Sequence, residues 1–155
     1  MNIIHLDSSN IGIWNDKIHA YLQDVGNSEI QMLYQNPGYT MQRLAAGAEQ
    51  SFLAEEGGRI SGMLAAFSNM KKTVWNLILL HVTPERRLDQ VGTALVSALE
   101  QELASSVRQF RITAQCKVSD KYSNIFYLSK DFRFEGWCRA VEEADDMYVW
   151  AKIHR

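Results

Sequence analysis

Cysteine and proline are scarce in this sequence, and no apolar run is long. Cys116 and Cys138 are the only cysteines among 155 residues, and no Cys-x-x-Cys pair occurs. We therefore expect two free thiols that behave as small buried apolar residues, and neither a disulfide nor a redox motif. The four histidines also lack the spacing of metal ligands, so no metal is expected.

Other absent features narrow the class of protein. No apolar run approaches the length that spans a bilayer, and the N-terminus lacks the basic and apolar regions of a secretory signal. These absences favour a cytoplasmic protein that does not use a membrane as a partner. No dense basic tract with interleaved aromatic residues is present, which argues against nucleic acid as a partner.

The composition is that of a globular protein with one core. Hydrophobic residues make up 46% and charged residues 22% of the chain, and 155 residues predict a single domain over residues 1–155. The charge is uneven, because the first 58 residues hold seven acidic side chains against Lys17 and Arg43, whereas the remainder is net basic. The unevenness reflects either solvated surface or an acidic part that faces a cation and a basic part that faces an anion.

Apolar periodicity predicts the order of strands and helices. Asn10 is expected to cap the first helix, Gly26 to end it, and Gly57-Gly58 to turn a hairpin. The expected strands are 2–6, the two arms of the hairpin within 51–67, 73–82, 110–116, 132–141 and 147–153. The expected helices are 10–26, one or two short helices within 28–48, 91–103 and 123–131.

The strand at 73–82 organises the predicted sheet. It is almost wholly apolar, as expected for a central strand buried on both faces, and Pro84 ends it because proline cannot donate to a ladder. The following helix and strand imply a right-handed parallel crossover. The acidic segment 142–146 is expected to join the last two strands. The whole order predicts an α/β fold, with a mixed sheet and helices on both faces.

The segment "VTPERRLDQVGTALV", residues 82–96, carries the clearest chemistry. A helix N-terminus presents unpaired amides and a partial positive charge. Gly92 leaves room for an anion to approach, and Arg86 and Arg87 add donors suited to phosphate oxygens. The turn is therefore predicted to hold a phosphate or a pyrophosphate. Its spacing is neither that of a Walker loop nor that of the dinucleotide fingerprint.

The same segment resembles the coenzyme A motif of the GNAT superfamily of N-acetyltransferases. That motif runs Val-x-Pro, a few residues, Arg/Gln-x-x-Gly-x-Gly/Ala, and then a helix. Val82, Pro84, Arg87 and Gly92 take the matching places, while Gln90 stands where the family has its first glycine. A glutamine fits there if its backbone stays at negative φ.

A second segment, "NIFYLSKDFRFEG", resembles the family's Asn-x-x-x-Leu-Tyr-x-x-x-Gly-Phe stretch. Asn124, Phe126, Tyr127 and Phe132 match it, and Asp131 replaces the glycine. The resemblance covers roughly residues 50–155 and is specific in these two motifs. The two motifs together indicate the family more strongly than either does alone.

The resemblance implies a fold and a cosubstrate. In the GNAT fold a mixed, mostly antiparallel sheet contains a splayed parallel pair of strands, and acetyl-coenzyme A (acetyl-CoA) lies in the gap between them. Its pantetheine pairs with the end of the fourth strand, and its pyrophosphate binds the amides that follow. The cofactor-binding residues predicted in this way are Leu80, Val82, Arg87, Leu88, Asp89, Gln90, Val91, Gly92, Thr93 and Asn124.

The resemblance also implies direct attack of an amine on the thioester. Tyr127 is the predicted proton donor to the departing thiolate, since a pKa of about 10 lets a tyrosine keep its proton until the thiolate forms. The alternative is that Tyr127 only packs beside Phe126. No carboxylate lies between Val74 and Val82 to act as the base. The amine proton is then taken by water, which Asn76 could hold, or by His81, which is the second catalytic candidate.

The acceptor is predicted to be a primary amine of a small molecule or a protein. The acidic N-terminal region contains Trp14, Tyr34 and Tyr39, which suits a cationic acceptor with an apolar portion, although core aromatics and surface acids explain it as well. The aromatic residues of the last strands form either a homodimer surface or part of the core.

Two other functions stay open from the sequence. Gln90, Asp131 and the missing strand carboxylate would suit a GNAT-like module that binds acyl-CoA without turnover. A phosphate-binding scaffold unrelated to coenzyme A would show no preference for coenzyme A over ATP. The acetyltransferase is favoured because both motifs occur in the family's order.

Overall fold

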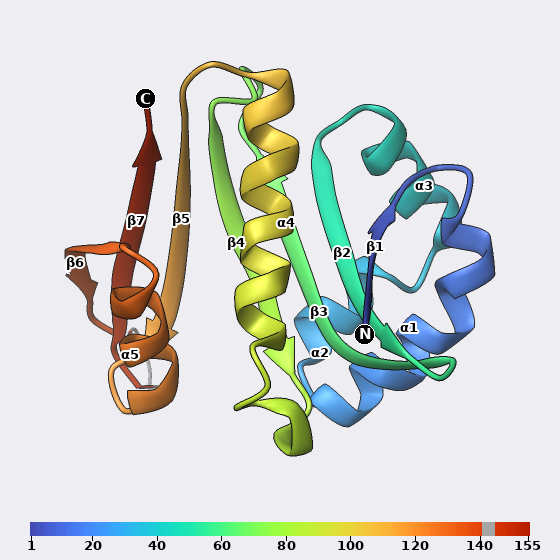
Figure 1. Cartoon of the computed structure of the whole chain (residues 1–155), viewed down its shortest axis with the longest axis horizontal. Coiled ribbons are helices and arrows are strands. Elements are labelled where there is room, and N and C mark those ends of the chain that lie inside the picture. Colours follow the sequence, from blue (N-terminus) through green and yellow to red (C-terminus); the bar gives the residue numbers. More distant parts are fainter. Residues whose placement is uncertain (141–144) are drawn as a thin grey trace.

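A seven-stranded sheet, in the order β1-β2-β3-β4-β5-β7-β6, forms the centre of the molecule (Figure 1). The computed structural model describes residues 1–140 and 145–155. Neighbouring strands are antiparallel except for β4 and β5, which are parallel. The strands are β1 (Asn2–Leu6), β2 (Glu49–Glu56), β3 (Arg59–Ser68), β4 (Val74–Val82), β5 (Phe110–Lys117), β6 (Arg133–Cys138) and β7 (Met147–His154).

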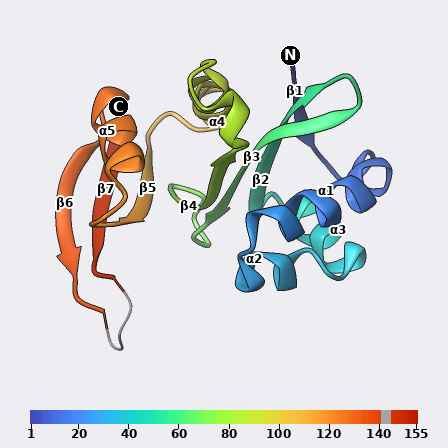
Figure 2. The ribbon, with the colours of Figure 1, turned by 90° about the horizontal axis from the view of Figure 1, so that it is seen from below.

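Helices cover both faces of the sheet, as predicted (Figure 2). One face carries α1 (Ile11–Val25), α2 (Ser28–Leu33) and α3 (Pro37–Ala45), and the other carries α4 (Val91–Ser106) and α5 (Lys121–Ser129). Each face has its own apolar core, because alternate side chains of a strand point to opposite faces. None of the helices in the described part of the chain is long and apolar enough to cross a membrane.

Asparagine, glycine and proline set the ends of the N-terminal helices. Gly26 ends α1 in the left-handed conformation, with φ 74°, as predicted. Asn10 precedes α1 but does not cap it, because its Oδ1 accepts from the backbone amide of Asp7 at 2.9 Å instead. Asn36 caps α3, and Pro37 is the first residue of that helix, where a missing N–H leaves no bond unmade.

A buried polar cluster joins α3 to β2. Glu49 is 1% exposed. Its carboxylate accepts from Nε of Arg43 at 2.7 Å, from the hydroxyl of Ser51 at 2.7 Å and from the hydroxyl of Tyr34. The guanidinium of Arg43 also donates to the carbonyl of Leu33 at 2.9 Å. A buried carboxylate is tolerated only with such partners, so the cluster fixes the helical layer to the sheet.

The fourth strand bends where its pairing with β5 stops. β4 pairs with β5 only from Val74 to Leu77, and the register between β3 and β4 then skips Ile78, which is the extra residue of a β-bulge. A bulge bends its strand and re-aims the side chains that follow. β4 was predicted to be buried on both faces, but only Trp75 and Leu79 are buried, Asn76 is exposed, and the other six residues are partly buried. After Leu77 the edge of β4 toward β5 has no partner. The parallel strands therefore part (Figure 1).

The last two strands differ in exposure. Trp150 on β7 is 7% exposed and packs in the core, whereas Trp137 on the edge strand β6 is 56% exposed. Cys116 is buried, as expected, but Cys138 is exposed because it lies on that edge strand. A homodimer through these aromatic residues stays a prediction. The acidic turn predicted at 142–146 falls partly on residues 141–144, outside the described residues.

Candidate active site

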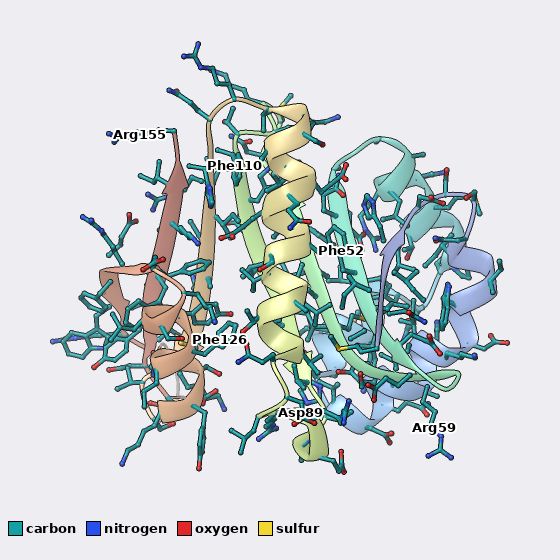
Figure 3. All side chains as sticks on the ribbon, viewed as in Figure 1. Phe52, Arg59, Asp89, Phe110, Phe126 and Arg155 are labelled. Atoms are coloured by element: carbon teal, nitrogen blue, oxygen red, sulfur yellow. The ribbon has the colours of Figure 1, made fainter. Side chains whose placement is uncertain are left out.

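The parting of β4 and β5 opens a cavity of about 430 Å³ beside the start of α4 and the inner side of α5. Figure 3 shows Asp89 below the start of α4 and Phe126 on α5 at this end of the sheet. Most of the predicted site residues line the cavity, namely Leu80, His81, Val82, Arg87, Leu88, Gln90, Gly92, Thr93 and Tyr127. The segment of α5 adds Asp120, Tyr122, Ser123, Phe126, Ser129 and Lys130.

The first turn of α4 carries unpaired backbone amides. Within the described residues, the amides from Gln90 to Thr93 donate no hydrogen bond to the protein. The helical bonds begin with the amide of Ala94, which donates to the carbonyl of Gln90 at 2.9 Å, and no side chain caps the helix. Unpaired amides at the positive end of a helix form an anion site. The amides of this turn are therefore free to bind an anion, which is what the predicted pyrophosphate contact requires.

Gln90 holds this turn in the left-handed conformation, with φ 65°. The expectation of a negative φ was wrong. The chain turns here from a short 3-10 segment (Pro84–Arg86) into α4, and the turn needs a positive φ whichever residue stands there. Glycine adopts this φ without strain, whereas a glutamine does so at a cost of about 1 kcal/mol. Gln90 thus adopts a conformation that favours glycine.

The two arginines of the loop have different partners. Arg86 pairs with Glu56 and, at 2.9 Å, with Asp89, and neither Arg86 nor Asp89 is among the lining residues. Arg87 does line the cavity, and its Nε donates to the carbonyl of Val82 at 3.4 Å. The predicted pair of phosphate-binding arginines therefore reduces to Arg87, because Glu56 on β2 already neutralises the other one.

Two glycines let α4 lie close to its neighbours. A Cβ at Gly92 would stand 3.3 Å from the ring of Phe126, so α5 approaches α4 closely here. A Cβ at Gly62 on β3 would stand 2.8 Å from Cγ1 of Val91. Val91 is fully buried, so its side chain belongs to the core and only its amide is available to a ligand.

Tyr127 is both packed and open to the cavity. Its ring meets Phe126 and Phe132 edge to face, with centroids 5.6 and 5.1 Å apart. Burial raises its pKa, and the neighbouring Cys116 and Asp120 raise it further. Its hydroxyl makes no hydrogen bond to the side chains that the structure describes. The phenol therefore keeps its proton at neutral pH and is available as a donor.

His81 faces the other side of the sheet from Tyr127. It follows the bulge on β4, lines the cavity and lies with its Nδ1 2.7 Å from the hydroxyl of Tyr21 on α1. Burial lowers its pKa, and the positive charge of Arg87 lowers it further. The imidazole is therefore neutral at neutral pH and can accept a proton.

Comparison with known families decides the class of protein. The sequence model of the Acetyltransferase (GNAT) family matches residues 14–132. The chain belongs to the GNAT family. This GNAT protein is accordingly an acetyl-CoA-dependent acetyltransferase that transfers the acetyl group to an amine. No protein in the curated set matches the chain.

Solved structures agree with the GNAT fold. A GNAT-family acetyltransferase from Streptococcus pneumoniae aligns with a TM-score of 0.80 at 14% identity over 99% of each chain. An aminoglycoside 6'-N-acetyltransferase complexed with coenzyme A aligns with a TM-score of 0.75 at 19% identity, over 99% of this chain and 97% of that one. The aminoglycoside 6'-N-acetyltransferase from Enterococcus faecium aligns with a TM-score of 0.71 at 20% identity, over 99% and 97%. Identities this low show the fold alone.

Asn124 of this GNAT acetyltransferase lies outside the cavity lining. Its Nδ2 donates to the carbonyls of Lys117 at 3.0 Å and Asp120 at 2.8 Å. Its Oδ1 accepts from the indole of Trp150 and the thiol of Cys116, both at 2.9 Å. The carboxamide is thus used within the protein. This geometry places Asn124 as a brace between α5 and the sheet and gives no support to its predicted contact with the cofactor.

Sequence reasoning missed two partners in the site. Tyr21 on α1 binds His81, but it falls on the apolar stripe of a predicted helix and there reads only as a core residue. Thr113 on β5 donates its hydroxyl to Oδ1 of Asn76 across the last part of the parallel ladder. Asn76 is therefore engaged through Oδ1 at the fork of the strands, whereas His81 lies further along β4, where the strand lines the cavity.

The buried thiol of Cys116 lies outside the residues that line the cavity. Burial raises the pKa of Cys116 to about 11, so its thiol stays protonated at neutral pH and is a weak nucleophile. No group of three or more histidine, cysteine, aspartate or glutamate side chains that could hold a metal ion occurs within residues 1–140 and 145–155.

Proposed function

We propose that this GNAT acetyltransferase moves the acetyl group to a primary amine of a small molecule or a protein by direct attack on the thioester between β4 and β5. The proposal depends on two structural features that lie at the same cavity. The half of β4 that has no partner on its β5 side lines the same cavity as the unpaired amides that begin α4. The amide-containing pantetheine arm can pair with a free strand edge as another strand would, and a pyrophosphate fits free amides.

The predicted cofactor residues divide between these two places. The backbone from Leu80 to Val82 would hold the pantetheine arm, and the amides from Gln90 to Thr93 with Arg87 would hold the pyrophosphate. Leu88 is 93% exposed at the cavity rim, where an apolar side chain can cover part of the cosubstrate. The proposal assigns no contact to the side chains of Asp89, Val91 and Asn124.

Tyr127 would protonate the leaving group. When the amine nitrogen bonds to the carbonyl carbon, the C–S bond breaks and the electron pair goes to sulfur. A thiolate is a weaker base than a phenolate, so the phenol stabilises it through a hydrogen bond and passes the proton as the attacking nitrogen loses its own. The raised pKa of Tyr127 ensures that this proton is present at the start.

His81 would deprotonate the acceptor amine. An alkylamine is mostly protonated at neutral pH and must lose a proton before it can attack. The neutral imidazole of His81 can take it directly or through one water. His81 and Tyr127 contact the cores on opposite faces of the sheet, so the base would serve the acceptor from the α1 side and the acid the thioester from the α4 side.

The acceptor class follows from charge. The helices on the α1 side carry Asp16, Asp24 and Glu29 against Lys17 and Arg43, and a cationic amine would enter on this side. Structural neighbours are named for acetylating aminoglycosides, which are polyamines. We include aminoglycosides, polyamines and a peptide with a free amino terminus in one acceptor panel.

A thiol-release assay with acetyl-CoA and this panel tests the proposal. Tyr127→Phe should lower kcat about 100-fold. Gly92→Glu places a carboxylate in the anion seat and should weaken acetyl-CoA binding at least about tenfold by calorimetry. Gly12→Glu is the matched control, because Gly12 is also the second residue of its helix and has open space around it.

The outcomes separate the alternatives. Acetyl-CoA binding without transfer to any amine would indicate a sensing module, and equal affinity for coenzyme A and ATP would indicate a general phosphate site. Normal turnover in Tyr127→Phe would remove the proposed acid, and unchanged affinity in Gly92→Glu would remove the proposed pyrophosphate seat.

A further inference from the structure

A tyrosine from α1 holds the catalytic candidate on β4. The hydroxyl of Tyr21 lies 2.7 Å from Nδ1 of His81 and donates to the backbone carbonyl of the same residue at 3.0 Å. The two rings meet edge to face, with centroids 5.5 Å apart. Tyr21 is 6% exposed, so water competes little for its hydroxyl. The side chain and the backbone of His81 are thus tied to one atom of the helical layer.

This arrangement selects one tautomer of the imidazole. A phenol has one proton to donate, and a carbonyl oxygen can only accept. The proton of Tyr21 therefore goes to the carbonyl of His81. The second contact is then satisfied only if Nδ1 carries a proton and donates it to the phenol oxygen. A neutral imidazole with its proton on Nδ1 has its lone pair on Nε2.

We propose that Tyr21 is a positioning residue that keeps His81 in the Nδ1–H tautomer, so that Nε2 is the atom that takes the proton of the acceptor amine. The proposal rests on the proposed function and adds to it the tautomer, the accepting atom and the residue that sets both. Tyr21 itself touches neither the amine nor the thioester in this scheme.

The surrounding charges support a neutral imidazole. Tyr21 on α1 and Arg87 in the loop after β4 are the titratable and charged groups that face His81 in the described part of the chain. Burial raises the pKa of Tyr21, so the phenol remains a neutral donor. Burial and Arg87 lower the pKa of His81, so the imidazole is unprotonated before the amine arrives.

The protons balance in the resulting scheme. Nε2 takes one proton from R–NH₃⁺, and the free amine bonds to the acetyl carbon as the C–S bond breaks. The second proton leaves the attacking nitrogen and ends on the coenzyme thiol by way of Tyr127. His81 then returns its proton to water. The bond from Nδ1–H to the Tyr21 oxygen stays in place throughout and stabilises the transient imidazolium.

Nitrogen NMR of the full chain tests the tautomer without any turnover. In ¹⁵N-histidine-labelled protein, long-range proton–nitrogen spectra distinguish protonated from bare ring nitrogens, and His81→Gln assigns the signal. We expect a protonated Nδ1 and a bare Nε2 at neutral pH. Tyr21→Phe should convert His81 to a mixture of tautomers, while Tyr148→Phe, at a tyrosine on β7 that packs edge to face against Phe134, should not.

Kinetics test the consequence. Tyr21→Phe should lower kcat/KM about tenfold, a part of the roughly 100-fold that a positioned base contributes, and should move the acidic limb of the pH profile. The affinity for acetyl-CoA should stay within about twofold of the parent. Tyr148→Phe, outside the cavity lining, should change neither quantity.

Three results would overturn the proposal. One is a bare Nδ1 with a protonated Nε2 in the parent protein, another is an unchanged tautomer in Tyr21→Phe, and the third is a pH profile that Tyr21→Phe leaves unaltered. A parent protein that acetylates no amine would instead defeat the proposed function. The tautomer would then still be decided by the spectra.

Discussion

Gln90 and Asp131 share one backbone conformation, with φ of 65° and 64°, although they lie in different motifs. Each stands where the GNAT motifs place a glycine. Each therefore adopts a left-handed conformation that favours glycine, one at the entry to α4 and the other after α5. The two departures alter the strain in the site and leave its shape intact.

Replacing these residues by glycine should stabilise the protein. Gln90→Gly should raise the free energy of unfolding by about 1 kcal/mol, because it relieves a left-handed non-glycine residue. Asp131→Gly should gain less, since aspartate tolerates this conformation better. Gln101→Gly, inside α4, is the control and should lower stability by about 1 kcal/mol in the same urea titrations. A loss of stability in Gln90→Gly would contradict the hypothesis that the backbone is strained at Gln90.

The contact of Gly62 with α4 predicts a large effect of one methyl group. Gly62→Ala would place Cβ 2.8 Å from Val91 and 3.1 Å from Leu95. Such overpacking should lower the free energy of unfolding by about 2 kcal/mol and shift the start of α4. Acetyl-CoA should then bind more weakly in calorimetry. Gly12→Ala, with nothing within 4 Å, is the control and should be neutral or stabilising.

Arg87 and Arg86 should differ in their effect on the pH dependence of His81. The positive charge of Arg87 disfavours the imidazolium, so Arg87→Gln should raise the pKa of His81 toward its ordinary value. A higher pH is then needed to keep the imidazole neutral, and the NMR titration of His81 should move upward. Arg86→Gln should move it less, since Glu56 and Asp89 offset that charge. Equal shifts would contradict the assignment of Arg87.

The buried cluster around Glu49 predicts a strong effect far from the cavity. Arg43→Leu removes the cation 2.7 Å from a carboxylate that is fully buried. The free energy of unfolding should fall by about 3 kcal/mol at neutral pH, because the remaining charge is unpaired. Arg59→Leu, on the exposed start of β3, should change it little. Urea unfolding of both variants makes the comparison, and a loss in Arg43→Leu no larger than in Arg59→Leu would show that the ion pair is dispensable.

Much of the fold could be predicted because local patterns agreed with one another. The alternation in 110–116, the hairpin turn at Gly57-Gly58 and the stripe of α4 each indicated one structure. The two motifs then indicated the parallel pair that parts. What periodicity could not show was the bulge at Ile78, since one extra apolar residue in an apolar strand leaves no pattern.

The candidate site could be predicted from the sequence only where the expected contacts are made by backbone groups. The seat around Gly92 follows from a strand, a turn and a helix, all of which are readable in the sequence. Side-chain partners were not readable. The pairing of Arg86 with Glu56 and that of Tyr21 with His81 join residues 30 and 60 positions apart. Such pairs depend on how the helices pack against the sheet, and a single sequence gives no information about that packing.

The short ladder between β4 and β5 is a weak junction between the two parts of the sheet. In the described part of the chain the ladder between β4 and β5 has four residue pairs, and the hydroxyl of Thr113 donates to Asn76 beside them. An acetyl-CoA lying in the opening would act as a strand shared by both sides. Binding would then hold the two parts of the sheet together and slow amide hydrogen exchange in β4 and β5. Free coenzyme A could leave only when these contacts break. The rate of turnover would thus depend on how readily β4 and β5 move apart locally.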